Sequence, residues 1–416
     1  MIFLRQKKIN FLNLKILSII CASIIPLLVI GPFLPDLVIS CLAIWFLYFT
    51  IKNKIYKIYK NIYFYIFIIF CLVCILSSIL SDNILLSLKA SLFYVRIGIF
   101  ALLISYLIDQ NKKILDYFYY ALIASFSCLI IDGYFQHFSG FNLFGYPIIQ
   151  MRISSFFGDE LILGSYLTRL FPLLFALFVA RPNKQPFEVY FVSILFLLID
   201  VLVFLAKERT AFVLFNLSTI YIIIFISSYK WLRIRTFIIS LCLIFLLTIF
   251  DNQLYDRYIK NPIEGLSNNK NEKYFISQEH DKLFKIAWKM FLDKPILGHG
   301  PKLFREKCID SKYAIEKTEN YSCSIHPHNF YLQLLAETGM VGFLFLAGLF
   351  CYFIYLSIKH IFQFFIHKKK WLTDYQICLL SGLLITIWPI TANGNFFTNY
   401  LMLFYSIQIG FFRKKI

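Results

Sequence analysis

Two residues in the second half of the chain have side chains suited to a group-transfer reaction. His328 stands at the start of one long apolar stretch, and Arg209 stands at the start of another, within the sequence KERTA. A neutral imidazole can take a proton from an attacking hydroxyl group, and the ordinary pKa of histidine, near 6.5, leaves it largely neutral at pH 7. A guanidinium is permanently charged and binds anionic oxygens in pairs. The simpler interpretations are a histidine that caps a helix, and an arginine that pairs with Glu208 or reaches the lipid headgroups.

The composition indicates that these residues belong to a membrane protein. Hydrophobic residues make up 59% of the chain, charged residues only 15%, and the mean hydropathy is +0.71. A soluble globular protein has roughly 25% charged residues. The formal net charge of +18 comes from short basic clusters between apolar stretches, so it indicates membrane topology and gives no reason to expect nucleic-acid binding.

The apolar stretches are numerous enough for about twelve membrane-spanning helices, because each span takes roughly 20 apolar residues. We expect spans at 12–30, 34–51, 61–80, 86–108, 114–136, 158–180, 187–206, 210–228, 232–250, 330–358, 372–390 and 396–412. Connections on one side hold clusters of lysine and arginine, whereas those at 31–35, 81–83 and 391–395 hold none. The positive-inside rule therefore predicts that both termini are cytoplasmic.

The basic residues on the outer side are not explained by orientation, and they mark the regions where we expect chemistry. They are Arg152, the KERTA sequence and several residues between Asp251 and Pro327. We therefore divide the chain into spans one to nine (1–250), a periplasmic loop (251–329) and spans ten to twelve (330–416). Arg96 and Arg169 fall within predicted spans, where a charge usually marks a functional interior. For these two the alternative is pairing with Asp132, Glu160 or Asp200.

The outer loop contains one predicted amphipathic helix near 280–293. Its apolar residues share one stripe, and we expect this stripe to lie on the outer leaflet of the membrane because the sequence shows no soluble core for it to join. The stripe consists of Leu283, Phe284, Ile286, Ala287, Met290 and Phe291. Cys308 and Cys323 are the only two of the ten cysteines in this loop, which predicts a disulfide in an oxidising compartment.

Three segments, taken in order, resemble the superfamily of O-antigen ligases and polymerases. In HPHNFYLQLLAETGMVG (326–342), His328-Asn329 is followed after nine residues by Gly339 and then Gly342, which is similar to the His-(Asn/Ser/Gln)-x9-Gly-x-x-Gly pattern of that superfamily. KERTAF (207–212) resembles its short arginine-bearing loop, and WKMFLDKPILGHGPKLF (288–304) resembles the stretch ahead of its histidine. The resemblance covers roughly residues 150–400.

The resemblance implies an all-α polytopic membrane protein similar to C-type glycosyltransferases, located in the bacterial inner membrane with a periplasmic active site. Its donor would be an undecaprenyl diphosphate-linked glycan. The acceptor would be lipid A-core for a ligase, or a growing polysaccharide for a polymerase, and a third branch of the superfamily glycosylates proteins. A secondary transporter or a scaffold protein is the alternative from another class, although the sequence shows no repeated halves.

The resemblance also implies roles for individual residues. His328 would be the general base, and Arg209 would stabilise the charge that develops on the leaving diphosphate. Many members carry a second arginine near the loop helix, but Phe284 stands at the matching position here. Residues expected to bind substrate are Arg152, Arg169, Arg257, Lys282, Lys285, His326 and Asn329. No Cys/His set or Asp-x-Asp pair suggests a metal, so we expect metal-independent transfer without a cofactor.

Overall fold

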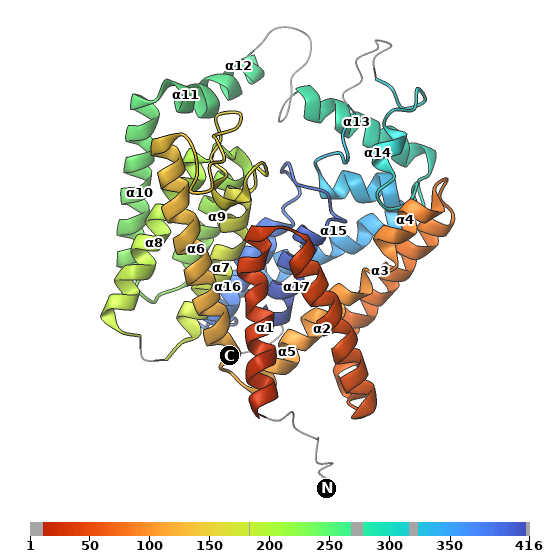
Figure 1. Ribbon diagram of the computed structural model, residues 1–416, viewed down its shortest axis with the longest axis horizontal. Coiled ribbons are helices and arrows are strands. Elements are labelled where there is room, and N and C mark those ends of the chain that lie inside the picture. The colour runs from red at the N-terminus through yellow and green to blue at the C-terminus, as the bar shows by residue number, and fades with distance from the viewer. Residues whose placement is uncertain (1–10, 183, 268–277, 316–322, 413–416) are drawn as a thin grey trace.

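The computed structural model describes residues 11–182, 184–267, 278–315 and 323–412. These residues form a bundle of helices, and the only extended pairing among them is two isolated β-bridges (Figure 1). The helices of the bundle are α1 (Phe11–Ile30), α2 (Phe33–Lys52), α3 (Ile62–Ile79), α4 (Ile84–Ser91), α5 (Val95–Gln110), α6 (Ile114–Ser139), α7 (Leu163–Ala180), α8 (Pro186–Leu205), α9 (Arg209–Phe225), α10 (Lys230–Phe250), α15 (Phe330–Phe365), α16 (Asp374–Thr386) and α17 (Asn399–Phe412).

Nine helical stretches of the described residues are long and apolar enough to cross a membrane. They are α1, α2, α3, the pair α4–α5, α6, α7, α8, α10 and α15. The other three predicted spans coincide with α9, α16 and α17, which have 17, 13 and 14 residues. These three are shorter than the roughly 20 residues that a full span takes. The all-helical, polytopic membrane architecture is therefore confirmed, and the number of twelve spans stays a prediction.

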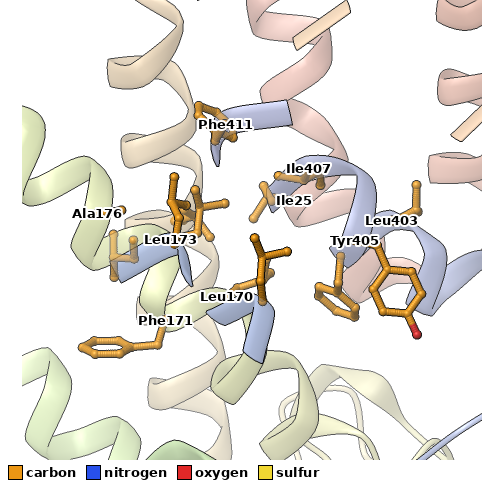
Figure 2. Close-up of a cluster of buried hydrophobic side chains, with 14 of the residues drawn as sticks. Ile25, Leu170, Phe171, Leu173, Ala176, Leu403, Tyr405, Ile407 and Phe411 are labelled. Atoms are coloured by element: carbon orange, nitrogen blue, oxygen red, sulfur yellow. The ribbon is translucent and has the colours of Figure 1, made fainter. Parts of the chain in front are cut away.

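Helix α7 lies inside the bundle. Protein buries 83% of its membrane window, compared with 22% for α10. Leu170 and Leu173 of α7 belong to one apolar cluster with Ile25 of α1 and with Leu403 and Ile407 of α17 (Figure 2). A polar side chain on α7 therefore faces other helices of the protein and is shielded from lipid.

The region between α10 and α15 contains five short helical elements in its described parts. They are α11 (Asn252–Tyr255), the π-helical turn η3 (Asp256–Lys260), α12 (Asn261–Ser267), α13 (Gln278–Asp293) and α14 (Phe304–Lys307). In Figure 1, α11 and α12 lie beyond the end of α10, whereas α13 and α14 lie on the other side of the molecule, near α15 and α4. The two halves of this region therefore meet different parts of the bundle.

The amphipathic helix is present as α13, but the expectation that its apolar stripe faces lipid is wrong. Leu283, Ile286, Ala287 and Met290 are buried, and they pack against apolar residues of α14, of the segment after it and of the first turns of α15. These partners are Phe304, Cys308, Tyr313 and Ala336. The sequence did not reveal this small core because its members are spread over more than 50 residues and none forms a long apolar stretch.

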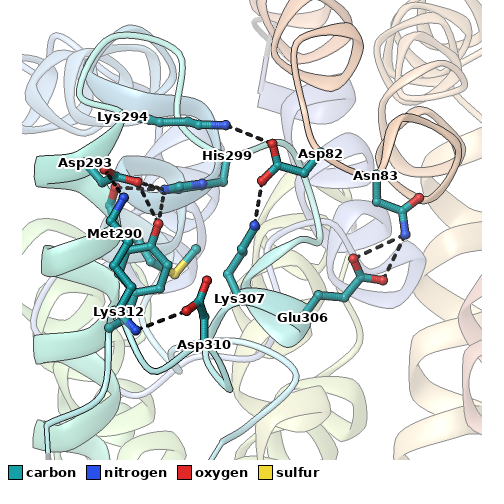
Figure 3. Close-up of polar contacts among 11 residues, drawn as sticks. Asp82, Asn83, Met290, Asp293, Lys294, His299, Glu306, Lys307, Asp310 and Lys312 are labelled. Atoms are coloured by element: carbon teal, nitrogen blue, oxygen red, sulfur yellow. Dashed lines mark hydrogen bonds and ion pairs between the residues drawn. The ribbon is translucent and has the colours of Figure 1, made fainter.

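Ion pairs attach this outer region to the turn between α3 and α4. Asp82 lies 3.3 Å from the Nζ of Lys294 and 2.5 Å from the Nζ of Lys307 (Figure 3). The side-chain amide of the next residue, Asn83, donates to both carboxylate oxygens of Glu306, at 3.0 and 3.2 Å. Exposed pairs of this kind contribute only about 0–1 kcal/mol each. Their main consequence is therefore to fix the position of the segment around α14 over the bundle.

Helix α15 breaks at Gly339, where the backbone has φ 64° and ψ −165°. A Cβ atom at this position would lie 2.2 Å from the carbonyl oxygen of Ile296, so only glycine allows the loop to come this close. The loop is held there by backbone hydrogen bonds, from Gly300 to Glu337 at 2.8 Å and from Met340 to Pro295 at 2.8 Å. Gly339 thus allows the loop that follows α13 to pack against the kink of α15.

Cys308 and Cys323 form a disulfide, which confirms the predicted pairing. The bond connects the end of α14 to the segment that leads into His328. We expect that alkylation of purified, non-reduced protein labels neither thiol, and that both become labelled after reduction. Peptide mass spectrometry measures this. The matched control is Cys308→Ser, in which Cys323 should be labelled without reductant, and labelling of both thiols in non-reduced wild-type protein would contradict the assignment.

Candidate active site

The start of α15 is fixed by Asn329, which is the N-cap of the helix. Its side-chain oxygen accepts hydrogen bonds from the backbone N–H groups of Tyr331 at 3.0 Å and Leu332 at 3.1 Å. Its side-chain amide donates to the carbonyl of Pro389 at 2.8 Å. Both ends of this side chain are thus engaged within the protein, and only 7% of the residue is exposed. The structure therefore gives Asn329 a positioning role, whereas the sequence predicted that it binds substrate.

Three histidine rings lie together just before this cap. The ring centroid of His328 is 4.1 Å from that of His326 and 5.1 Å from that of His280, which lies on the first turns of α13. The Nε2 atom of His328 is 3.3 Å from the hydroxyl oxygen of Ser324. We call His280, His326 and His328 the histidine group. Sequence analysis missed His280 because no spacing pattern connects α13 to the start of α15.

Burial lowers the pKa of each member of the histidine group. The pKa of His328 falls to about 4 because of burial and the neighbouring charge of His280. The pKa of His326 falls to about 3, also through burial first and then through the charge of His328. Burial lowers the pKa of His280 as well, and the positive charge of Arg209 lowers it further. All three rings are therefore neutral at pH 7, and Arg209 lies within electrostatic reach of His280.

The KERTA sequence spans the end of the connection between α8 and α9 and the first turn of α9, which begins at Arg209. Glu208 does not pair with Arg209. The carboxylate of Glu208 accepts hydrogen bonds from the backbone N–H groups of Gly164 at 2.8 Å and Ser165 at 3.0 Å. Its ion-pair partner is Arg152, at 3.7 Å. Among the described residues, the guanidinium of Arg209 has neither a hydrogen-bond nor an ion-pair partner, although it is half-buried. The simpler interpretation of Arg209 as the partner of Glu208 is therefore wrong.

Two other arginines predicted to bind substrate hold this loop in place. Arg152 donates to the carbonyl oxygens of Leu161 at 3.1 Å and Ala206 at 3.4 Å, in addition to its pair with Glu208. Arg257 of η3 donates to the carbonyl oxygen of Lys207 at 3.3 Å. Arg257 lies within electrostatic reach of Arg209. Both Arg152 and Arg257 are engaged by backbone carbonyls, so their contacts fix the connection that precedes Arg209.

The two arginines of the predicted spans have other partners than we expected. Arg96 pairs with Asp36 of α2 at 2.5 Å. Arg169 of α7 is only 4% exposed, and it donates to the side-chain oxygen of Asn393 at 3.2 Å and to the hydroxyl of Ser165. Among the described residues, no hydrogen bond or ion pair joins either arginine to Asp132, Glu160 or Asp200. The alternative that these arginines pair with those carboxylates is therefore wrong.

Asn393, in the connection before α17, joins these parts and was missed by sequence analysis. Its backbone N–H donates to the carbonyl of His328 at 2.7 Å. Its own carbonyl lies 3.2 Å from the Nε2 atom of His326, and its side chain accepts from Arg169. Asn393 thus positions two members of the histidine group, His326 and His328, relative to Arg169 of α7.

Asn393→Ala should reduce the stability of the protein by roughly 1–3 kcal/mol, because it removes a hydrogen-bond acceptor from the buried guanidinium of Arg169. Thermal unfolding in detergent measures this change. Asn393→Asp is the matched control, since it keeps an acceptor at the same position and should retain more stability than the alanine variant. Equal unfolding temperatures for wild type and Asn393→Ala would show that the contact contributes nothing.

The two lysines predicted to bind substrate lie on α13. Lys285 is exposed and pairs with Asp281 of its own helix at 3.3 Å, so it does not join the histidine group. Lys282 is partly buried on the same helix. Phe284, one helical turn after His280, has its ring centroid 6.4 Å from the ring of that histidine. Phe284 lines an open groove of about 420 Å³ together with Trp288, Ile315, Leu332 and the two lysines Lys285 and Lys289.

The histidine group does not form a metal site. Over the described ranges, no group of three or more His, Cys, Asp or Glu side chains could hold a metal ion. The expectation of metal-independent chemistry stays a prediction. The arrangement instead combines neutral imidazoles with a guanidinium that has no partner in the described part of the chain, and it suits a proton transfer next to a bound anion.

These features define a class: a polytopic helical membrane protein whose histidine and arginine site is built from interhelical loops and helix ends. Residues 192–347 match the family model described as O-antigen ligase. The match confirms the resemblance to the O-antigen ligase superfamily and supports glycosyltransferase activity of the ligase or polymerase type. The matched segment contains Arg209 and the whole histidine group, whereas Arg152 and Arg169 precede it. A comparison with curated proteins gave no significant match.

Proposed function

We propose that this protein is an O-antigen ligase that transfers glycan from an undecaprenyl diphosphate-linked donor to a hydroxyl group of lipid A-core. The reaction would take place at the periplasmic face of the bacterial inner membrane, with both termini cytoplasmic. The observation that carries the proposal is the guanidinium of Arg209, which has no protein partner among the described residues and lies within electrostatic reach of His280, a member of the histidine group. An unpaired, half-buried cation of this kind favours an anionic ligand.

The chemistry follows from the charges that develop during transfer. The acceptor hydroxyl loses its proton to His328 as its oxygen attacks C1 of the donor sugar, and the bond from C1 to the diphosphate breaks. Negative charge then grows on the diphosphate oxygens, where the planar guanidinium of Arg209 binds two of them. A neutral His328 is required for the first step, and burial supports this protonation state.

The groove beside α13 supports a lipid-linked substrate. Trp288 and Ile315 present apolar surface there, and Phe284, which also lines the groove, is next to His280. A prenyl chain in this groove would leave its diphosphate near the histidine group. In this arrangement α13 would admit the donor along the side that carries Phe284 and Trp288, away from its buried residues.

Purified protein in lipid nanodiscs, supplied with a lipid-linked glycan and lipid A-core, should form glycan joined to lipid A-core. Gel separation of the products measures this bond. In a deletion strain we expect lipid-linked polymer to accumulate unligated. Core carrying a single repeat would instead identify a polymerase, and movement of the glycan without a new bond would identify a transporter.

The activity of the wild-type protein should extend to unusually acidic pH. A general base works in its neutral form, so its rate falls as the pH drops through its pKa, and the pKa of His328 is lowered to about 4. We expect the acidic limb of kcat/KM, which reports the free enzyme, to have its midpoint well below pH 6.5. Initial transfer rates between pH 4 and pH 8 measure this, and a midpoint at pH 6.5 would be inconsistent with a buried base.

A further inference from the structure

His280 is held against His328 by the packing of α13. The buried stripe of that helix lies on the small core that includes Ala336 of α15, so the first turns of α13 are fixed beside the start of α15. The two rings are 5.1 Å apart between centroids, with an angle of 65° between their planes. Both rings are partly buried and partly accessible. The pair is therefore not fully enclosed by the described part of the protein.

The two neighbours of His328 are not equivalent. His326 is buried, and its Nε2 atom faces the backbone carbonyl of Asn393 at 3.2 Å, so this ring is anchored to the bundle. His280 is on the opposite element, α13, and it feels the charge of Arg209. His280 is therefore adjacent to the proposed base and lies within electrostatic reach of Arg209, the proposed site of the diphosphate.

We propose that His280 carries the acceptor's proton from His328 to the leaving diphosphate, which makes it a second catalytic histidine of the proposed glycan transfer. This inference rests on the proposed function. As the new bond from the acceptor oxygen to C1 forms, the proton of the acceptor hydroxyl moves to His328. The electron pair of the broken bond from C1 to oxygen stays on the diphosphate. His328 then passes its proton to His280, and His280 passes a proton to a diphosphate oxygen, so both rings end neutral.

The local charges explain why a second ring is needed. Burial disfavours the imidazolium form of His328, so this residue holds a proton poorly and must release it quickly. The charges that act on these rings include Glu279 on α13, which raises the pKa of His280, and Arg209 on α9, which lowers it, while Arg305 lowers the pKa of the neighbouring His326. A diphosphate bound at Arg209 would offset that cation and favour a proton on His280.

The substitutions at this position separate proton transfer from simple binding. A neutral imidazole accepts a proton on one nitrogen and donates one from the other. Glutamine forms hydrogen bonds but does not gain or lose a proton near neutral pH, and arginine keeps its positive charge permanently. We therefore choose His280→Gln, His280→Arg and His280→Ala. His367→Gln is the matched control, because it makes the same change in an exposed histidine just beyond the end of α15.

The experiment measures kcat, KM for the lipid-linked donor and rescue by free imidazole, using the purified full chain in nanodiscs. We expect His280→Gln and His280→Arg to lower kcat by about 10²-fold, with KM for the donor changed by less than about twofold. Imidazole should restore part of the rate of His280→Ala, and His367→Gln should behave like wild type. A raised KM with unchanged kcat, or full activity of His280→Arg, would overturn the proposal and make His280 a binding residue.

A measurement on the wild type keeps the proposal testable if the variants fold poorly. In mixtures of light and heavy water, a rate-limiting step that transfers two protons together should give a curved dependence of kcat on the deuterium fraction. A straight line would indicate one proton and would overturn the relay. Absence of any glycan transfer by the wild type would instead contradict the proposed function itself, so the two failures are distinguishable.

Discussion

His328→Asn and His328→Ala are expected to lower the kcat of glycan transfer by roughly 10²–10⁴, which is the usual contribution of a positioned general base. An acceptor hydroxyl is a weak nucleophile until its proton is removed, and no carboxylate in the described part of the chain contacts His328 to replace it in this role. The protein should still fold and insert, because the contact from Asn393 goes to the backbone carbonyl of His328 and survives a change of side chain.

The asparagine variant is the better test of the two. His328 has φ 56°, a left-handed conformation that asparagine and histidine adopt more readily than most residues. His328→Asn therefore changes the chemistry with little backbone strain, whereas alanine adds a conformational cost. His367→Ala provides the control for loss of an exposed histidine. Transfer by His328→Asn at a near wild-type rate in the nanodisc assay would reduce His328 to a residue that precedes the cap of α15.

The positions of the nine long apolar helices in the described residues could be predicted because a membrane helix is encoded locally. A stretch of about 20 apolar residues has to cross the hydrocarbon, and its ends are marked by charge or by glycine and proline. The break in α15 could not be predicted in this way. It depends on the loop at Ile296 meeting Gly339, and that contact is visible only in three dimensions. The lipid-facing placement of α13 failed for the same reason, since Phe304 and Tyr313 complete its core from outside the helix.

The candidate site was predicted where a residue could be placed at a helix end, and was missed where it depends on contacts between distant segments. Arg209 and His328 were identified from the resemblance to the O-antigen ligase superfamily together with their positions at the starts of apolar stretches. Asn393 and His280 carry no local signal, and their roles follow from hydrogen bonds and ring contacts with residues far along the chain. The sequence also could not show that Arg152 holds the KERTA connection and does not simply await a substrate, because its ion pair with Glu208 joins two loops that are far apart in the chain.

The arginines around the KERTA sequence differ in how many of their N–H donors are already engaged by the protein, which decides how many remain for an anion. Arg152 and Arg257 donate hydrogen bonds to backbone carbonyls and so have fewer donors left for a ligand. Arg209 has no such contact in the described residues. Substitution of Arg152 or Arg257 by alanine therefore removes contacts that hold the loop, and substitution of Arg209 removes a group that the fold itself does not use.

Arg209→Ala should consequently lower kcat/KM for glycan transfer by roughly 10²–10³, equivalent to about 3–4 kcal/mol of lost transition-state stabilisation, with an unchanged unfolding temperature. Arg209→Lys should stay impaired, because an ammonium is a point charge and cannot bind two diphosphate oxygens through a planar fork. Arg235→Ala, which removes an exposed arginine near the start of α10, is the control for loss of positive charge. Full activity of Arg209→Lys would mean that only the charge is needed. Full activity of Arg209→Ala would move the diphosphate site elsewhere, and Arg169 of α7, which already reaches Asn393 beside the histidine group, would then be the arginine to test.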